Sequence, residues 1–263
     1  MKCIVCDKNE LHAGLDGIDD NYELYVSCFP DPDERETKQK LKLLFVRVSG
    51  WNYAQLFDDS GALKGVCQFV QLGRSAFFEH IYVAPEVRLL GYGTELLRTV
   101  EKFLAERGVE FVFAEMNDDR LMTAEEIAAD VPHPLERYKF WVKMGYQMVN
   151  APYRQPPLVD FIPTAAELEL LADDDELEES SGESEEPATV DYLSVIVKPL
   201  KGGDTVPALV YLDALSDYFG TFLPTGQDPR QDPCYLEAEA LLSGHLHLDL
   251  MPLGTARTLV QTR

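Results

Sequence analysis

Apolar residues recur with helical and with extended spacing along the first 200 positions of the chain. Runs of β-branched and aromatic residues bounded by turn residues predict strands at 51–57, 65–72, 77–83, 109–116, 146–149 and 192–197. Apolar residues three and four positions apart predict helices at 23–44, with a break at 30–33, and at 93–107, 123–130 and 135–144. This order predicts an α/β fold: a mixed, mostly antiparallel sheet with helices on both faces.

Two segments depart from this pattern. Residues 163–189 are poor in aromatic residues and rich in Asp, Glu and Ser, which predicts an acidic, mobile insertion. Residues 208–219 and 234–243 have helical spacing, and residues 247–250 resemble a strand. We therefore expect a domain of residues 1–200 that contains the insertion, and a small C-terminal extension, residues 201–263, that packs on it.

The formal net charge is −23, and it is unevenly distributed. Twelve acidic residues lie between positions 160 and 190, and no Lys or Arg lies between Arg154 and Lys198. Nucleic acids and anionic membranes are bound by basic surfaces, so this charge argues against both as partners. It favours a cationic acceptor such as an amine, although an acidic run that only solvates a loop explains it as well.

Composition predicts a cytoplasmic protein without a metal site. The chain has no run of about 18 apolar residues, and its first residues are too polar for a signal peptide. Its five cysteines fit a reducing compartment better than a set of disulfides. Cys3 and Cys6 lack a second pair at zinc-site spacing, and we interpret them as part of a short apolar strand. The sequence leaves an oligomer open.

The segment from Phe78 to Thr94, FEHIYVAPEVRLLGYGT, joins a strand to a helix. The strand ends at Val83, and a loop with Gly91 and Gly93 leads directly into the helix. A helix N-terminus has free backbone N–H groups and the positive end of the helix dipole, and glycines let a phosphate approach the backbone closely. Arg88 adds a positive charge just before the turn. The segment therefore predicts a site for a pyrophosphate group.

A Gly-x-Gly sequence before a helix is weak evidence alone, and neither the dinucleotide fingerprint nor a P-loop is present. Arg88-x-x-Gly91-x-Gly93, however, closely resembles the Arg/Gln-x-x-Gly-x-Gly/Ala signature of the GNAT superfamily of acetyl-CoA-dependent N-acetyltransferases. Residues 140–146, FWVKMGY, are similar to the family's pattern of two aromatic residues, a glycine and an aromatic residue on the next helix and strand. The motifs occur in the family's order, and the resemblance covers residues 22–199.

This resemblance implies acetyl-CoA as co-substrate and assigns residues to it. The pyrophosphate would be bound by the loop, which comprises Arg88, Leu89, Leu90, Gly91, Tyr92, Gly93 and Thr94. The pantetheine arm would pair with the main chain of the preceding strand at Ile81, Tyr82 and Val83. Asn117 matches a position that often touches the cofactor, although it is equally well explained as a plain turn residue. Trp141 also belongs to the implied cofactor site.

Acyl transfer to an amine needs a base that removes a proton from the amine. Alternation along the strand places Glu79 on the face of Val83 and His80 on the opposite face, so that only one of the two can face the acceptor. In the resembled family the base often lies on this strand with the parity of Val83, which makes Glu79 the preferred base and His80 the alternative. Each also has a structural interpretation, at the solvated end of the sheet for Glu79 and in the core for His80.

The general acid that protonates the leaving thiolate is less well defined. The family usually has a tyrosine at the position of Trp141, and an indole N–H is not a practical acid. Tyr138 lies one helical turn earlier on the same face and can substitute for it, and water is the alternative. Tyr153, Arg154 and Gln155 lie in a proline-rich connection, a region that commonly shapes the acceptor pocket in this family.

The function that the resemblance implies is transfer of an acetyl group from acetyl-CoA to a primary amine of a small molecule or of a basic side chain. A second hypothesis is a catalytically weak GNAT-fold module that binds acyl-CoA or a protein partner, because Trp141 replaces the tyrosine and residues 201–263 extend the domain. Transfer of a longer acyl group is a third hypothesis, since an apolar tunnel is not visible in a sequence.

Overall fold

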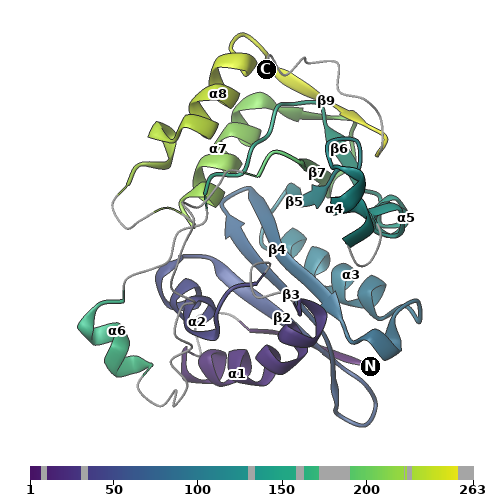
Figure 1. Ribbon diagram of the computed structural model, residues 1–263, viewed down its shortest axis with the longest axis vertical. Helices are drawn as coiled ribbons and strands as arrows, with labels where there is room; N and C mark the ends of the chain where they lie inside the picture. The colour runs from purple at the N-terminus through teal and green to yellow at the C-terminus, as the bar shows by residue number, and fades with distance from the viewer. Residues whose placement is uncertain are drawn as a thin grey trace. The chain divides into compact units, whose positions relative to one another are not determined.

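The fold is described here from a computed structural model of residues 1–263. The structure describes residues 1–6, 11–30, 35–129, 134–157, 163–171, 190–221, 223 and 227–253. The chain divides into two units, whose elements are drawn in Figure 1. Unit 1 comprises Met1–Gln71, Phe78–Glu106 and Val159–Glu186, and unit 2 comprises Leu72–Phe77, Arg107–Leu158 and Pro187–Arg263. Within the described ranges no helix combines the length and the apolar character that crossing a membrane requires.

Unit 1 contains a sheet and the helices that cover it. Its elements are β1 (Lys2–Cys6), α1 (Leu11–Cys28), α2 (Lys38–Arg47), β2 (Trp51–Phe57), β3 (Leu63–Leu72), β4 (Ser75–Val83), the 3-10 helix η3 (Pro85–Val87), α3 (Tyr92–Glu106) and α6 (Ala165–Leu170). The strands are hydrogen-bonded neighbours in the order β1-β2-β3-β4, and β2 is antiparallel to both β1 and β3. The short strand expected at Cys3 and Cys6 is confirmed as β1.

Helices cover both faces of the unit 1 sheet. On one face, the Tyr53 hydroxyl of β2 donates to a carbonyl of α1 at 2.7 Å, and the Phe45 ring of α2 lies 5.8 Å from the Trp51 ring of β2. On the other face, the Phe103 ring of α3 lies 6.0 Å from the Phe69 ring of β3. The expected α/β arrangement, a mostly antiparallel sheet flanked by helices, is confirmed.

Helix α1 packs closely against Phe45 of α2 and against Tyr53 of β2. A Cβ atom at Gly14 would come within 2.3 Å of the Phe45 ring, and one at Gly17 would come within 2.1 Å of the Tyr53 hydroxyl oxygen. Both distances are far below van der Waals contact, so a side chain at either position would force the buried Phe45 ring or the buried Tyr53 ring to move. The sequence predicts this helix only from residue 23, whereas α1 begins at Leu11, because these glycines lower the helix propensity of its first half.

Unit 2 contains a second set of paired strands. Its elements are β5 (Phe111–Asn117), α4 (Ala124–Ala129), α5 (Pro134–Met144), β6 (Gln147–Val149), β7 (Leu193–Pro199), β8 (Thr205–Pro207), α7 (Ala208–Phe219), the 3-10 helix η4 (Pro229–Gln231), α8 (Pro233–Leu242) and β9 (His247–Met251). They are hydrogen-bonded in the order β5-β7-β6-β9-β8, with antiparallel neighbours. Strands β5, β6, β7 and β9 confirm the sequence-based expectation, and β8 is additional.

Helix α7 packs on β5 within unit 2. Its Tyr211 ring lies 6.1 Å from the Phe113 ring. Its Tyr218 ring stacks on the ring of Phe77, a residue at the start of β4 that belongs to unit 2, with 3.6 Å between the centroids. Strand β9 pairs with β6 in the same unit. The described part of residues 201–263 therefore contributes the helices α7 and α8 and the strands β8 and β9 to unit 2.

Helix α6 lies at the start of the acidic segment that we expected to be mobile. Thr164 caps it, because its hydroxyl accepts from the Glu167 N–H while the Glu167 side chain accepts from the Thr164 N–H. Glu167 also accepts from Nε and Nη2 of Arg47 on α2, at 2.6 and 2.8 Å. Residues 165–170 thus form a capped helix that is paired with α2, and residues 172–189 lie outside the described residues.

We expect Glu167→Gln to lower the melting temperature and Glu169→Gln, on the same helix, to leave it unchanged. The Glu167 side chain is 15% exposed, whereas Glu169 is exposed. A two-point hydrogen-bonded ion pair of this kind contributes about 1 kcal/mol. The Arg47 hydrogen bond lowers the pKa of Glu167 from 4.5 to about 2, so this contribution is present above pH 4.5 and is lost as the pH falls through 2. Thermal unfolding at pH 7 measures it, and identical melting temperatures for the two variants would contradict the docking of α6.

Candidate functional site

The loop between β4 and α3 has the geometry of an anion-binding site. Leu89 has a φ of 64° and Gly91 a φ of 94°, so the chain passes through left-handed conformations just before α3 begins at Tyr92. The Glu95 N–H donates to the Gly91 carbonyl at 3.0 Å in the first turn of the helix. The N–H groups of residues 92–94 come before the first hydrogen bond of the helix, so no helix carbonyl accepts from them. With the positive end of the dipole, they can bind a phosphate.

The loop is also open to an incoming phosphate. Leu89 is 99% exposed and Leu90 is 67% exposed. A Cβ atom at Gly91 would meet no other atom of the described chain within 4 Å, so space is free on this side of the backbone. Arg88 is half-buried at the start of the loop. The residues expected to bind a pyrophosphate, 88–94, therefore form one continuous feature that fits such a group.

Glu79 lies half-buried on β4. The Trp51 indole N–H donates to its Oε2 at 2.6 Å, while its buried Oε1 has no hydrogen-bond partner among the described residues. Burial raises the pKa of Glu79 to about 7, the Trp51 hydrogen bond opposes the rise, and the charge of Glu36 adds to it. A carboxyl group with a pKa near neutrality exchanges protons in the range in which a general base operates.

His80, the next residue of β4, is turned towards α1. The Tyr25 hydroxyl oxygen of α1 lies 3.1 Å from Nε2, and the Phe29 ring lies 5.5 Å from the imidazole ring. Burial and, to a smaller extent, the charge of Lys40 lower the pKa of His80 to about 4. The ring is therefore neutral at pH 7 and is a poor base at that pH.

The expected placement of Glu79 and His80 on opposite faces is wrong. Trp51, the partner of Glu79, packs against Phe45 of α2. Tyr25, the partner of His80, belongs to α1, which covers the same face of the sheet. Two consecutive side chains on one face mean that the alternation is interrupted between them, as in a β-bulge. Parity therefore does not separate the two candidate bases, whereas their pKa values do.

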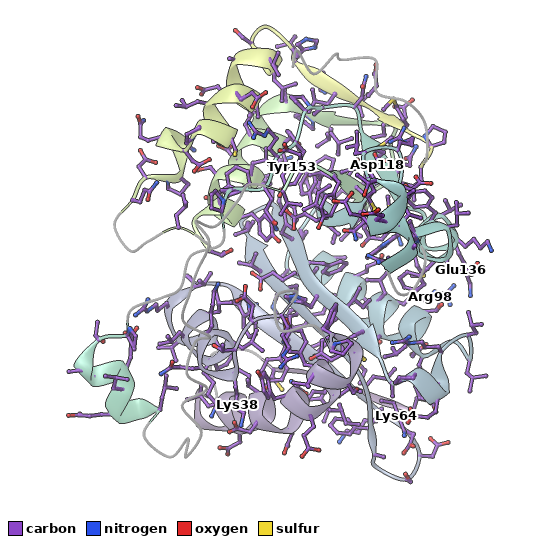
Figure 2. All side chains as sticks on the ribbon, in the orientation of Figure 1. Lys38, Lys64, Arg98, Asp118, Glu136 and Tyr153 are labelled. Atoms are coloured by element: carbon purple, nitrogen blue, oxygen red, sulfur yellow. The ribbon has the colours of Figure 1, made fainter. Side chains whose placement is uncertain are left out.

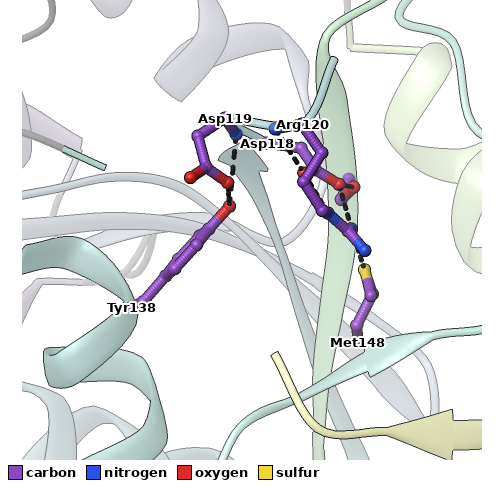
Figure 3. A network of polar contacts seen from close by, with 6 residues as sticks. Asp118, Asp119, Arg120, Tyr138 and Met148 are labelled. Atoms are coloured by element: carbon purple, nitrogen blue, oxygen red, sulfur yellow. Dashed lines mark hydrogen bonds and ion pairs between the residues drawn. The ribbon is translucent and has the colours of Figure 1, made fainter. Parts of the chain in front are cut away.

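The surroundings of Tyr138 do not favour the role of general acid. Its hydroxyl donates to Asp119 Oδ1 at 2.6 Å and accepts from the Asp119 N–H at 3.2 Å (Figure 3). Burial and then the hydrogen bond to Asp119 raise the pKa of Tyr138 above its ordinary value. A hydroxyl held in this way releases its proton less readily than a free tyrosine, which favours water as the proton source for the thiolate.

Asp118 organises the end of β5, and the sequence analysis did not single it out. Its side chain is buried and accepts from Ser194 Oγ at 2.6 Å and from Arg120 Nε at 2.7 Å (Figures 2 and 3). Burial alone would raise the pKa of Asp118, but the hydrogen bonds from Arg120 and Ser194 lower it. A charged run directly after an apolar strand is the signal that could have drawn attention to this ionised, structural carboxylate.

Asn117 and Trp141, the other residues implied for the cofactor, lie in unit 2. Asn117 is the last residue of β5 and immediately precedes Asp118. Trp141 is buried on α5, where its ring lies 5.2 Å from the Phe140 ring and 4.8 Å from the Tyr146 ring. Trp141 therefore packs inside an aromatic cluster, and the loop at 88–94 with Glu79 and His80 belongs to unit 1.

Glu115 of β5 is a second carboxylate that the sequence analysis missed. The Tyr153 hydroxyl donates to its Oε1, and the Gln155 amide and the Tyr218 hydroxyl each donate to its Oε2 at 3.0 Å. Arg154 forms ion pairs with other acidic side chains. The connection that we expected to shape an acceptor pocket is thus tied to β5 and α7 by hydrogen bonds, which explain its conformation without a ligand.

Comparison with known proteins gives a family for this fold and loop. Residues 18–124 match the model of the acetyltransferase (GNAT) family. Residues 18–124 therefore carry a GNAT acetyltransferase domain, and this match confirms the resemblance of the Arg88-x-x-Gly91-x-Gly93 motif; the motif at 140–146 lies outside the match. The matched residues include Glu79, His80 and the loop at 88–94. No curated protein matches the chain at a significant level.

Solved structures of other proteins also match the chain. A putative acetyltransferase of the GNAT family from Bacteroides thetaiotaomicron is 18% identical, with a TM-score of 0.46 over 76% of this chain and 87% of that one. The ribosomal-protein-S18-alanine N-acetyltransferase from Escherichia coli is 13% identical, with a TM-score of 0.44 over 77% and 96% of the two chains. An aminoglycoside 6'-N-acetyltransferase complexed with coenzyme A is 16% identical, with a TM-score of 0.46 over 76% and 97%.

Proposed function

We propose that the chain transfers an acetyl group from acetyl-CoA to a primary amine of a small molecule or of a basic side chain. The GNAT family, whose model matches residues 18–124, uses acetyl-CoA. The observation that carries the proposal lies in unit 1. There β4 holds Glu79, whose pKa burial raises to about 7, and the same strand leads into the phosphate-binding loop at 88–94.

In this proposal the loop binds the pyrophosphate of acetyl-CoA. The N–H groups at the start of α3 donate to its oxygens, and Arg88 adds a positive charge. The main chain of Ile81 to Val83 pairs with the pantetheine arm. Bound acetyl-CoA supplies the acetyl group as a thioester, and the residues of the chain hold it and handle the protons.

Glu79 is the proposed base. An alkylamine with a pKa of ~10.4 is almost wholly protonated at pH 7, and only the neutral nitrogen attacks the thioester carbonyl. As the C–N bond forms and the C–S bond breaks, the ammonium loses two protons in all. Glu79 Oε1 accepts one and releases it to solvent, and the other reaches the departing thiolate through water, because the Tyr138 hydroxyl is held by Asp119.

The proposed acceptor carries a positive charge before it reacts. The formal net charge of −23 attracts cations and repels nucleic acids and anionic membranes. A cationic amine therefore suits this protein better than an anionic acceptor does.

The test is release of free CoA from acetyl-CoA with a panel of primary amines. We expect at least one amine to raise CoA release clearly above the rate of hydrolysis alone. The alternative function is a module that binds acyl-CoA without turnover, and the hydrogen-bonded Tyr138 and the buried Trp141 favour it. Tight binding of acetyl-CoA by calorimetry, with no amine-dependent release across the panel, would support the alternative and contradict the enzyme.

A further inference from the structure

Three buried polar atoms lie on one short stretch of β4 without a hydrogen-bond partner among the described residues: Glu79 Oε1, His80 Nδ1 and the Tyr82 hydroxyl. The His80 and Tyr82 rings lie 5.1 and 5.5 Å from the Tyr25 ring of α1, and Glu79 is held by Trp51 on the same face. The stretch spans about 10 Å of strand. Buried polar atoms in native proteins are nearly always hydrogen-bonded, so these three atoms can pair with a bound polar ligand or with ordered water.

The hydrogen bonds of Tyr25 define which nitrogen of His80 carries the proton. Tyr25 is fully buried, and its hydroxyl oxygen accepts from the Glu36 N–H at 3.0 Å. Its own O–H then needs an acceptor, and His80 Nε2 lies 3.1 Å away. Because the ring is neutral and Nε2 accepts, Nδ1 carries the hydrogen. His80 therefore presents a buried N–H donor on the residue that follows Glu79, and both side chains lie on the same face of the sheet.

We propose that Glu79, His80 and Tyr82 form an acceptor-binding site that selects amines with a hydrogen-bond-accepting oxygen close to the amino group, such as amino alcohols and α-amino amides. This proposal rests on the proposed function and adds the class of acceptor. The amino group donates to Glu79 Oε1, and the neighbouring oxygen accepts from His80 Nδ1–H. The Tyr82 hydroxyl, which can both donate and accept, completes the site. Tyr25 is a positioning residue that acts through His80.

The donor on His80 is what separates this class from plain alkylamines. An alkylammonium group offers only donors and apolar carbon, so it leaves the His80 N–H without an acceptor when it occupies the site. A site built to hydrogen-bond a substrate oxygen discriminates strongly against an analogue that lacks it, because the buried polar group of the protein is then unpaired. We expect kcat/KM for ethanolamine to exceed kcat/KM for its isostere propylamine by about tenfold or more. Both values are calculated with the concentration of the neutral amine, because the two amines differ in pKa.

Two substitutions separate the two nitrogens of His80. The side-chain amide of His80→Asn reaches about as far as Nδ1, so it keeps the N–H that donates to the oxygen of the substrate. The side-chain amide of His80→Gln reaches about as far as Nε2, so it keeps only the atom that accepts from the Tyr25 hydroxyl. We expect His80→Asn to keep most of the preference for ethanolamine over propylamine. We expect His80→Gln to lose it, so that the ratio of the two kcat/KM values falls about tenfold, towards one.

Nuclear magnetic resonance of protein labelled with 15N in its five histidines gives a readout that does not depend on turnover. The His80 signals, assigned by their loss in His80→Gln, should show a neutral ring protonated at Nδ1 at pH 7. Tyr25→Phe removes the donor to Nε2, so the protonated nitrogen should change to Nε2. Ethanolamine, but not propylamine, should shift the Nδ1 signal of the unsubstituted protein.

The outcomes separate this proposal from the proposed function. If no amine releases CoA, the proposed function fails, and the ethanolamine-dependent shift of Nδ1 still decides whether the site binds this class of amine. If amines are acetylated but the two His80 variants have the same ratio of kcat/KM for ethanolamine to kcat/KM for propylamine, the acceptor-selecting role is wrong. It is also wrong if His80 is protonated at Nε2. Equal shifts with the two amines, or none, would mean that ordered water alone pairs the three atoms.

Discussion

Glu79→Gln is expected to lower kcat by about 10²–10⁴-fold while the Kd for acetyl-CoA changes little. Glutamine keeps the size of the side chain and can still accept the hydrogen bond from Trp51, but it does not take up a proton. The substitution lies on β4 and leaves the loop at 88–94 unchanged. Steady-state kinetics at saturating acetyl-CoA give kcat, and calorimetry gives the Kd.

The pH profile distinguishes a base from a residue that only supports the structure. Only ionised Glu79 accepts a proton, so kcat should rise as the pH increases through 7, where burial places its pKa, and then level off. Glu79→Gln should lack this step and should gain rate only as more neutral amine becomes available. Trp51→Phe removes a hydrogen bond that lowers the pKa of Glu79, so its profile should move to higher pH.

The stability of the protein should fall over the pH range in which kcat rises. The pKa of Glu79 is raised on folding, from 4.5 to about 7, so its contribution to stability is fully present below pH 4.5 and is lost as the pH rises through 7. Glutamine is never ionised, and Glu79→Gln should therefore have a higher melting temperature than the unsubstituted protein at pH 8 but not at pH 4.

Full activity of Glu79→Gln at neutral pH, together with loss of activity towards every amine in His80→Gln, would assign the role of base to His80 instead.

Local periodicity was enough to predict most of the fold. Strand β2 occupies the predicted residues 51–57, and α3 lies within one residue of the predicted 93–107 at each end. The first half of α1 could not be predicted, because Gly14 and Gly17 weaken its helical pattern. They are present because Phe45 and Tyr53, distant in sequence, approach the helix backbone, and that approach is a tertiary contact.

The candidate site, like the fold, could be predicted where it depends on adjacent residues and not where it depends on tertiary contacts. The loop at 88–94 is a local strand–loop–helix motif, and its geometry follows from adjacent residues. The shared face of Glu79 and His80 depends on how α1 and α2 pack on β4, which alternation alone does not contain. Asp118 and Glu115 were missed because their partners lie far along the chain, 76 residues away for Ser194 and 103 for Tyr218.

Gly93→Asp is expected to weaken acetyl-CoA binding by at least about a hundredfold. Gly93 is the second residue of α3, where its N–H has no acceptor within the helix. A carboxylate at about 4 Å from one phosphate charge is repelled by about 4 kcal/mol at an effective dielectric constant of 20, which corresponds to about a thousandfold in Kd. Calorimetry with acetyl-CoA measures the loss.

The same substitution should not weaken the fold, and this separates lost binding from unfolding. An aspartate in the first turn of a helix interacts favourably with the helix dipole, and any residue but proline has a higher helix propensity than glycine. The melting temperature of Gly93→Asp without ligand should therefore stay the same or rise. Gly93→Ala is the matched control, because it adds a Cβ atom but no charge, and it should lose far less affinity. Equal losses in both variants would mean that space, not charge, limits the loop, and unchanged affinity in Gly93→Asp would show that the pyrophosphate is bound elsewhere.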